Sequence, residues 1–341
     1  MNHRSIISWL SIVCLLILII VFVGGMTRLT GSGLSMVRWE LFMGMKPPLS
    51  QADWEQTFDD YKDFPEYQKL RPNMTLDEFK VIFSWEYSHR MLGRVVGLVY
   101  LFGYLTFLIR RRLTKPLAWK LLFGFLLLSF QGFLGWFMVK SGLKENPYVS
   151  HYRLAAHLIA AFSLFAFLVW LILDLLPADE EPSPDRRLFR LSGSITGLIL
   201  LQIVYGAFVA GLKAGYMFNT FPTMHGFWIP PNLLDFDPVW QTWFANPLTV
   251  QFVHRSLAWL LLLVVPLFWL YTRFRSLSPQ QTLSTGVMAG IVLVQFILGV
   301  MTLVLHVPIG LAAMHQLTAC LLFGSAIWVM HSFAPHKDPS P

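Results

Sequence analysis

The stretch EYSHRMLGRVVGL at residues 86–98 is answered by QFVHRSLAWLLLL at residues 251–263. In both stretches a histidine followed by an arginine stands at the start of a long apolar run. A histidine inside a membrane segment is energetically costly and is usually functional. The recurrence of this arrangement therefore indicates a duplicated membrane protein that is organised around histidines.

Two further pairs of segments repeat in the same order. SFQGFLGWFMV at 129–139 resembles LVQFILGVMTLV at 293–304, and RLAAHL at 153–158 resembles GLAAMHQL at 310–317. Self-similarity of this kind is typical of internal duplication. Because both halves have the same topology, the axis that relates them should run along the membrane normal.

The composition predicts a membrane protein. Of the 341 residues, 55% are hydrophobic and 13% are charged, against roughly 25% charged in a soluble domain. Apolar runs of about 18 residues or more can cross a bilayer as helices. We therefore predict an all-α polytopic protein of two pseudo-symmetric four-helix bundles, residues 1–180 and 181–341. The eight expected spans are 6–25, 90–109, 117–139, 152–176, 190–212, 249–271, 282–305 and 309–333.

The basic residues predict the orientation. The net charge of +7 arises from Lys and Arg in short connections, such as Arg110–Arg112 and Arg273–Arg275. Such loops are typical of the cytoplasmic side of a membrane and do not indicate a nucleic-acid partner. We expect a multi-pass protein of a bacterial inner membrane, embedded in the lipid bilayer, with both termini in the cytoplasm. Cys14 and Cys320 lie inside apolar runs and suggest neither a disulfide nor a metal site.

Four histidines are the candidate ligands: His89, His157, His254 and His315. Each is expected near the outer end of a span, so that all four share one layer. Two imidazoles across a gap between helices suit axial ligation of a haem iron. A hydrogen bond to a neighbouring carbonyl explains any one of them equally well, but it explains the repeated set of four poorly. Zinc is a weaker candidate because no cysteine or HxxxH cluster accompanies them.

Five arginines are candidate contacts for haem propionates, because the Arg guanidinium matches a carboxylate bidentately. They are Arg28, Arg90, Arg94, Arg153 and Arg255. Taken singly, each is explained as well or better as an interfacial residue whose charged end reaches water.

The two halves differ beside the first histidine of each. Glu86 stands three residues before His89, whereas Gln251 holds the same place before His254. Residues three apart share a helix face, so Glu86 should face what His89 faces, where a carboxylate could accept a proton or stabilise positive charge. The alternative is a salt bridge to Arg90, four residues on. The asymmetry suggests that one half performs chemistry while the other carries electrons.

Other polar positions are less informative. Gln131 and Gln295 recur in matching spans, and we favour hydrogen bonds between helices over contact with a porphyrin. The Pro- and aromatic-rich loop around His225 could cover the second site, although ordinary interfacial turns explain it equally. We interpret His331 as a residue of the C-terminal tail.

Six motifs resemble one known family. They are GGMTRLTGSGLSM at 24–36, EYSHRMLGRVVG at 86–97, HYRLAAHL at 151–158, NTFPTMHG at 219–226, VQFVHR at 250–255 and AAMHQL at 312–317. Together they resemble the haem A synthase family, of the CtaA/COX15 type, from Gly24 to about residue 330. The match is specific as a set, whereas each motif alone is weak.

The resemblance implies an activity and a role for each candidate residue. Members have eight helices in two similar halves, with haem sites toward the outer face. The implied reaction is oxidation of a porphyrin methyl of haem O to a formyl group. His89 and His157 would flank the substrate haem with Glu86 as the catalytic carboxylate, and His254 and His315 would ligate a haem b cofactor. A haem O synthase partner, an electron acceptor and a homo-oligomer all remain open.

Two departures qualify the resemblance. The loop 26–85 lacks the cysteine pair of one branch and, with YKDFPEY at 61–67, is similar to the branch of proteobacterial and mitochondrial members. His225 stands where the family usually has Asp, which removes any argument for a role of that side chain. The main alternative function is a di-haem b-type electron-transfer protein without methyl oxidation, and a transporter is a third. A pure electron carrier has no need of a carboxylate in one half only.

Overall fold

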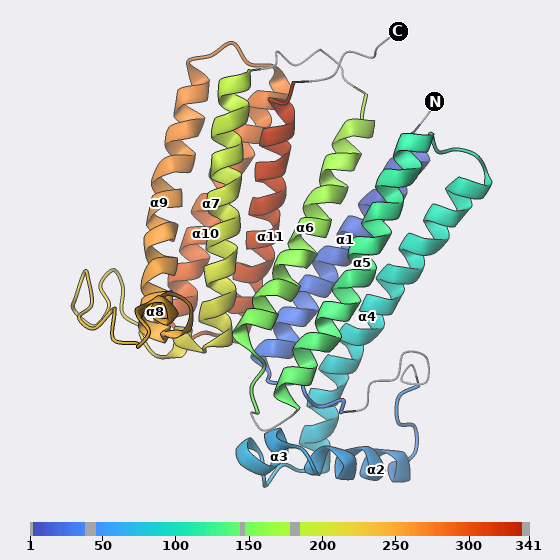
Figure 1. Ribbon diagram of the computed structural model, residues 1–341, viewed down its shortest axis with the longest axis vertical. Coiled ribbons are helices and arrows are strands. Elements are labelled where there is room, and N and C mark those ends of the chain that lie inside the picture. Colours follow the sequence, from blue (N-terminus) through green and yellow to red (C-terminus); the bar gives the residue numbers. More distant parts are fainter. Residues whose placement is uncertain (1–2, 38–45, 144–146, 178–184, 336–341) are drawn as a thin grey trace. The chain divides into compact units, whose positions relative to one another are not determined.

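The computed structural model describes residues 3–37, 46–143, 147–177 and 185–335. Regular structure within these ranges is helical, apart from an isolated bridge between Met224 and Phe227. The long apolar helices among them are α1 (Arg4–Leu29), α4 (Leu76–Ile109), α5 (Lys115–Gly142), α6 (His151–Leu175), α7 (Arg186–Gly211), α9 (Pro247–Arg273), α10 (Pro279–Val304) and α11 (Ile309–Ser332). These are 8 helices that can cross a membrane, so the predicted all-α class and the eight spans are confirmed (Figure 1).

One predicted boundary is wrong. The second span was expected to start at residue 90, but α4 begins at Leu76. The side chain of Thr75 accepts a hydrogen bond from the Glu78 N–H, and the Glu78 carboxylate accepts one from the Thr75 N–H. This reciprocal cap starts the helix in a charged stretch that hydropathy alone does not recognise. His89 therefore lies well inside α4 and not at its start.

The chain divides into two compact units, residues 15–161 and residues 1–14 together with 162–341. The boundary falls inside α1 and inside α6. The expected arrangement as two four-helix halves that meet at residue 180 stays a prediction.

In the unit that contains residues 162–341, four spans form a closed bundle. Helix α7 contacts α9, α9 contacts α10, α10 contacts α11, and α11 contacts α7. Ile199, Val265, Val292 and Val329 are buried among them. The short helix α8 (Val239–Ala245) and the 3₁₀ turn η2 (Ala214–Tyr216) lie against α9, near its first residues.

In the unit 15–161, α4 and α5 are neighbours, and the Tyr100 hydroxyl donates to the Leu121 carbonyl at 2.8 Å. Helices α2 (Gln51–Lys62) and α3 (Pro65–Leu70) cover the first turns of α4 (Figure 1). Their buried contact, which we call the aromatic cap, comprises Phe58, Tyr61, Phe79, Ile82 and Phe83. The Phe79 ring stacks on Phe58 and on Tyr61, with centroids 5.0 and 5.2 Å apart. Burial raises the pKa of the Tyr61 phenol.

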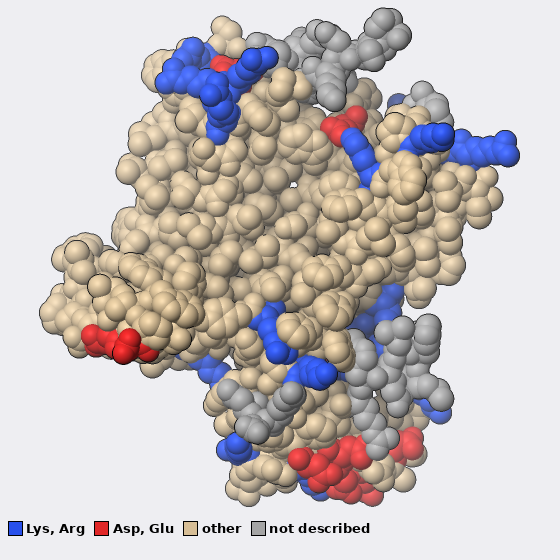
Figure 2. All heavy atoms as spheres, viewed as in Figure 1, with Lys and Arg blue, Asp and Glu red and all other residues tan. Residues whose placement is uncertain are grey.

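Charged side chains gather at the ends of the long helices and leave an apolar surface between (Figure 2). In the unit 15–161, Arg110–Arg112 follow α4, while acidic residues of α2 lie at the opposite end of α4. Large side chains along the helices are exposed, including Phe102 at 62% and Phe123 at 52%. Exposed apolar side chains of this size suit contact with lipid, and the molecule is a multi-pass membrane protein.

Candidate functional site

Three histidines are held against glycines of the preceding span. His157, His254 and His315 lie six or seven residues after the first residue of α6, α9 and α11. A Cβ atom built on the facing glycine would lie 3.1, 3.1 and 2.9 Å from the ring Cε1. The facing glycines are Gly135 of α5, Gly206 of α7 and Gly299 of α10. A Cβ at Gly299 would force a shift of the ring or the helix, and at Gly135 and Gly206 the imidazole would have to move by a few tenths of an ångström.

The fourth histidine also lies against a glycine, but a different edge of its ring faces that glycine. His89 of α4 faces Gly24 of α1, and a Cβ there would lie 2.9 Å from Nε2 and 3.2 Å from Cδ2. In the other three histidines the nearest ring atom is Cε1. The His89 ring is therefore turned relative to the rings of the other three.

Glutamines accompany three of the histidines. One turn before the facing glycine stands Gln131, Gln202 or Gln295, and its Nε2 lies 3.4 Å from Nε2 of His157, His254 or His315. Gln131 also donates to the His157 backbone carbonyl at 2.9 Å, which is the interhelical role predicted from sequence. Gln202 was missed, although the spacing of a glutamine four residues before a glycine recurs at 131–135, 202–206 and 295–299.

The position that corresponds to these glutamines beside His89 holds Ile20. It lies four residues before Gly24 in α1. Its Cδ1 would be 3.5 Å from a Cβ on Gly93, so the side chain reaches α4 one turn beyond His89. An aliphatic side chain here can pack against α4 but cannot hydrogen-bond the ring.

The four imidazoles form two pairs, and several of their ring nitrogens have no hydrogen-bond partner among the described residues. His89 interacts electrostatically with His157, and His254 with His315. Nδ1 of His157, His254 and His315 is buried without a hydrogen-bond partner among the described residues. In each of these rings Nε2 contacts a glutamine amide, and Nδ1 is the second nitrogen, without a partner among the described residues. Within the described ranges no three His, Cys, Asp or Glu side chains gather around one point. Paired imidazoles in glycine cradles thus fit a haem iron, which takes two axial ligands.

Glu86 is buried, and both of its carboxylate oxygens have hydrogen-bond partners. Its Oε2 accepts from the Ser35 hydroxyl and from the Met36 N–H, both at 2.7 Å. Its Oε1 pairs with the Arg90 guanidinium at 2.5 Å, and Arg90 also donates to the Met36 carbonyl at 2.8 Å. The salt bridge that was the alternative explanation of Glu86 is therefore present. The carboxylate holds residues 35–36 against α4, one turn from His89.

The second half uses the same positions for a similar contact without a carboxylate. Gln251 donates to the Ala214 and Phe218 carbonyls at 3.2 Å. Arg255 donates to the carbonyls of Phe218 and Thr220 at 2.5 and 2.7 Å. Glu86 with Arg90, and Gln251 with Arg255, each tie the segment before a span to that span. Only the first pair carries a negative charge.

Among the arginines expected at propionates, Arg90, Arg153 and Arg255 donate to backbone carbonyls. Arg90 and Arg255 do so as described, and Arg153 reaches the Phe137 carbonyl at 2.7 Å and lies 3.7 Å over the Phe137 ring. Arg94 lies 3.6 Å from the Met91 sulfur, and Arg28 is in the last turn of α1. Their role toward propionates stays a prediction.

Two further expectations meet the structure here. His331 is no tail residue: it lies in the last turn of α11, buried, with Nε2 3.1 Å from the Asp174 carboxylate and the ring edge-on to Trp170. His225 has a positive φ of 51°, and its N–H donates to the Thr220 hydroxyl at 2.7 Å. The backbone, more than the imidazole, thus explains this position.

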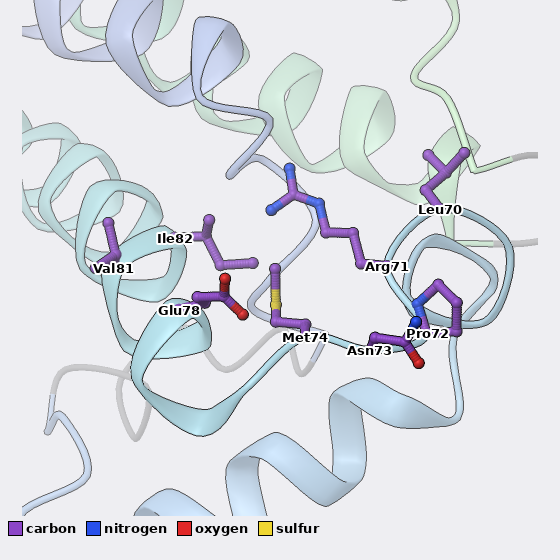
Figure 3. Close-up of a pocket in the computed structure, with 8 residues that line it drawn as sticks. All are labelled: Leu70, Arg71, Pro72, Asn73, Met74, Glu78, Val81 and Ile82. Carbon is purple, nitrogen blue, oxygen red and sulfur yellow. The ribbon is translucent and has the colours of Figure 1, made fainter.

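The unit 15–161 also has an open groove (Figure 3). Arg71, Met74, Glu78 and Ile82 line it, and none of the four candidate ligands does. Arg71 donates to the carbonyls of Thr30 and Gly31 at 3.2 and 3.0 Å and so holds the turn after α1. Sequence reasoning missed this arginine because no motif marks it.

Comparison with known proteins agrees with these observations. The model of a family named COX15-CtaA and described as "Cytochrome oxidase assembly protein" matches residues 7–327. The chain is 46% identical to a protein named "Heme A synthase" from Nitrosospira multiformis, over 96% of this chain and 93% of the relative. Proteins of the same name from Nitrosomonas eutropha and Parvibaculum lavamentivorans are 45% and 44% identical, over 96% and 98% of this chain and 93% and 95% of their own lengths.

Proposed function

Because the chain belongs to the COX15-CtaA family of cytochrome oxidase assembly proteins, we propose that it is a haem A synthase. It is an oxidoreductase that converts a methyl group of haem O to a formyl group. Two successive hydroxylations of the methyl carbon followed by loss of water give the formyl product. The observation that carries the proposal is the presence of two imidazole pairs, of which, among the described residues, only the pair of His89 and His157 has a buried carboxylate one turn away.

In this proposal the two pairs have different tasks. His89 and His157 flank the iron of the substrate, haem O, in the N-terminal half, residues 1–180. His254 and His315 hold a haem b cofactor in the C-terminal half, residues 181–341. When bound, that cofactor supplies a one-electron route out of the substrate site. A haem with two imidazole ligands has no open position, which suits electron transfer.

Glu86 acts as the catalytic carboxylate beside the substrate. Its negative charge is buried, and Arg90, Ser35 and Met36 hold it in one place. A carboxylate positioned in this way can stabilise positive charge that develops at a neighbouring carbon, or accept a proton. The same bonds also order residues 35–36, so structural support and catalysis by Glu86 need separate tests.

Charge placement supports the proposed orientation. The protein lies in a bacterial inner membrane with both termini in the cytoplasm, because the connections after α4 and α9 are rich in arginine. The imidazoles then lie toward the outer face, near the ends of α1, α5, α7 and α10. Propionates at this level are within the region of Arg28, Arg90, Arg94, Arg153 and Arg255. A haem O synthase, an electron acceptor and a second copy of the chain are further candidate partners.

A di-haem b-type electron carrier is the alternative, and the relatives do not favour it, since those named above carry the name of the synthase. The test is to express the chain in cells that make haem O but lack haem A, and to analyse the extracted porphyrins by mass spectrometry. We expect haem A only in cells that carry the chain. Unchanged haem O in well-folded, haem-loaded membranes would favour the electron carrier.

A further inference from the structure

The four histidine positions obey one rule with one exception. In three of them the helix opposite the histidine presents a glutamine and, one turn later, a glycine. The exception is His89, where the glycine is present as Gly24 but the glutamine is replaced by Ile20. The exception coincides with the turned ring, since His89 alone presents its Nε2 and Cδ2 edge to the glycine.

A primary amide beside an imidazole restrains the ring. It can donate to a ring nitrogen or accept from it, and can therefore hold either tautomer. The Oε1 atoms of Gln131, Gln202 and Gln295 are buried without a hydrogen-bond partner among the described residues, so these amides have acceptor capacity for a ring N–H. A side chain that hydrogen-bonds the second nitrogen of a ligand histidine orients the ring and raises its affinity for a metal. Ile20 can offer His89 only packing.

We propose that Gln131, Gln202 and Gln295 are positioning residues for three axial imidazoles, and that Ile20 leaves His89 as the one imidazole that releases its iron readily. The C-terminal pair then has two restrained ligands, and the N-terminal pair has one. This inference rests on the proposed function in one respect: the pair that contains His89 serves the substrate, which must enter and leave. A resident cofactor needs two ligands that release the iron slowly, whereas a substrate that must leave the site needs at least one ligand that releases it readily.

The test measures loss of haem from the purified full chain loaded with iron protoporphyrin IX at both sites. Excess apomyoglobin captures released haem, and the change in the Soret band gives the rates. We expect two phases in the unaltered chain, with the faster phase from the His89 and His157 pair. Ile20→Gln should slow the faster phase by about three- to tenfold, the worth of one hydrogen bond. The control Ile20→Leu, which adds no amide, should leave both rates unchanged.

The reciprocal change is made in the other half. Gln202→Leu should speed the slower phase by a similar factor, and Gln295→Leu should do the same from the opposite side of the site. These two variants test the proposal even where Ile20→Gln does not fold. Equal rates from the two sites of the unaltered chain would overturn it, as would rates that Gln202→Leu and Gln295→Leu leave unchanged.

The proposed function and the proposed role of the glutamines can be refuted separately. If the unaltered chain makes no haem A but the rates follow the pattern above, the proposed function is wrong and the assignment of the glutamines stands. If haem A is made and the rates ignore the substitutions, the function stands and the glutamines are only packing residues.

Discussion

At the residue scale, the sites depend on the absence of side chains at four glycines. Where a glycine faces a histidine, the backbone of one helix lies against the imidazole of the next. Gly299 has the closest approach to a ring carbon, 2.9 Å from its Cβ position to Cε1 of His315. Any Cβ at that distance forces the ring or the helix to move. The glycines therefore fix the position of each facing imidazole, and in our proposal the glutamines fix the orientation of the ring.

Gly299→Ala should displace His315 and weaken haem binding in the C-terminal half by about 10- to 100-fold, the usual effect of disturbing the support of a metal ligand. The bound haem is measured by its absorption spectrum after purification. Gly290→Ala is the matched control in the same helix, because nothing lies within 4 Å of its Cβ position. Equal haem contents in the two variants would contradict the cradle.

Glu86→Gln separates charge from support. The amide oxygen can still accept from Ser35 and Met36, but the negative charge is removed. We expect haem A formation to fall by about two to four orders of magnitude, the range of acid–base catalysis. The spectrum of the bound haem b should remain. Product formation close to normal would show that Glu86 serves only to hold residues 35–36.

Sequence alone predicts much at this scale and misses what depends on neighbours. The histidines were found because an imidazole in an apolar run is rare, and Glu86 because its counterpart is Gln251. The facing glycines and Gln202 were missed because small and amide residues are common in spans, and their meaning appears only when two helices lie together. Nothing in the spacing of Arg71 indicates that it holds the turn at Thr30 and Gly31.

At the scale of single elements, α4 is the clearest case of a helix that does two things. Its apolar part crosses the membrane, and its first turns carry Phe79 and Phe83 into the aromatic cap with α2. Hydropathy found the first part and missed the second, because Asp77, Glu78 and Lys80 interrupt the apolar pattern. The Thr75 and Glu78 cap was readable in the sequence as a T-x-x-E signature. The other spans were predicted to within four residues because apolar length alone defines them.

Phe79→Ala should loosen the aromatic cap at a cost of about 3–5 kcal/mol for a buried aromatic side chain. Limited proteolysis should then cut residues 46–75 faster, while the bound haem b of the other unit is unaffected. Val81→Ala, on the same helix with 59% of its surface exposed, is the control. Equal proteolysis of the two variants would mean that the cap does not depend on this ring.

For the whole molecule, the duplication predicted from the sequence repeats would account for the presence of a histidine pair in each half. The closed ring of α7, α9, α10 and α11 gives the second pair its surroundings, and residues 15–161 contain the first. Apolar runs predicted the eight spans, and sequence repeats predicted a duplication. They could not predict where the compact units divide, since that depends on packing between helices that are distant in the sequence.

Orientation in the membrane can be tested with single cysteines, because Cys14 and Cys320 are both buried. Gln56 of α2 and Ser276 between α9 and α10 are exposed. In sealed spheroplasts a membrane-impermeant maleimide should label Gln56→Cys at once and Ser276→Cys only after permeabilisation, because we expect the arginine-rich loops to face the cytoplasm. Labelling of Ser276→Cys in sealed spheroplasts would reverse the orientation.

We propose that the four imidazoles act as two pairs, one for a resident haem and one for a substrate. The most direct measurement is the low-temperature absorption and EPR spectrum of haem b in two purified double variants. We predict that His89→Ala with His157→Ala keeps a haem with two imidazole ligands, and that His254→Ala with His315→Ala loses it. Retention of that haem in the second variant, or its loss in the first, would contradict the account.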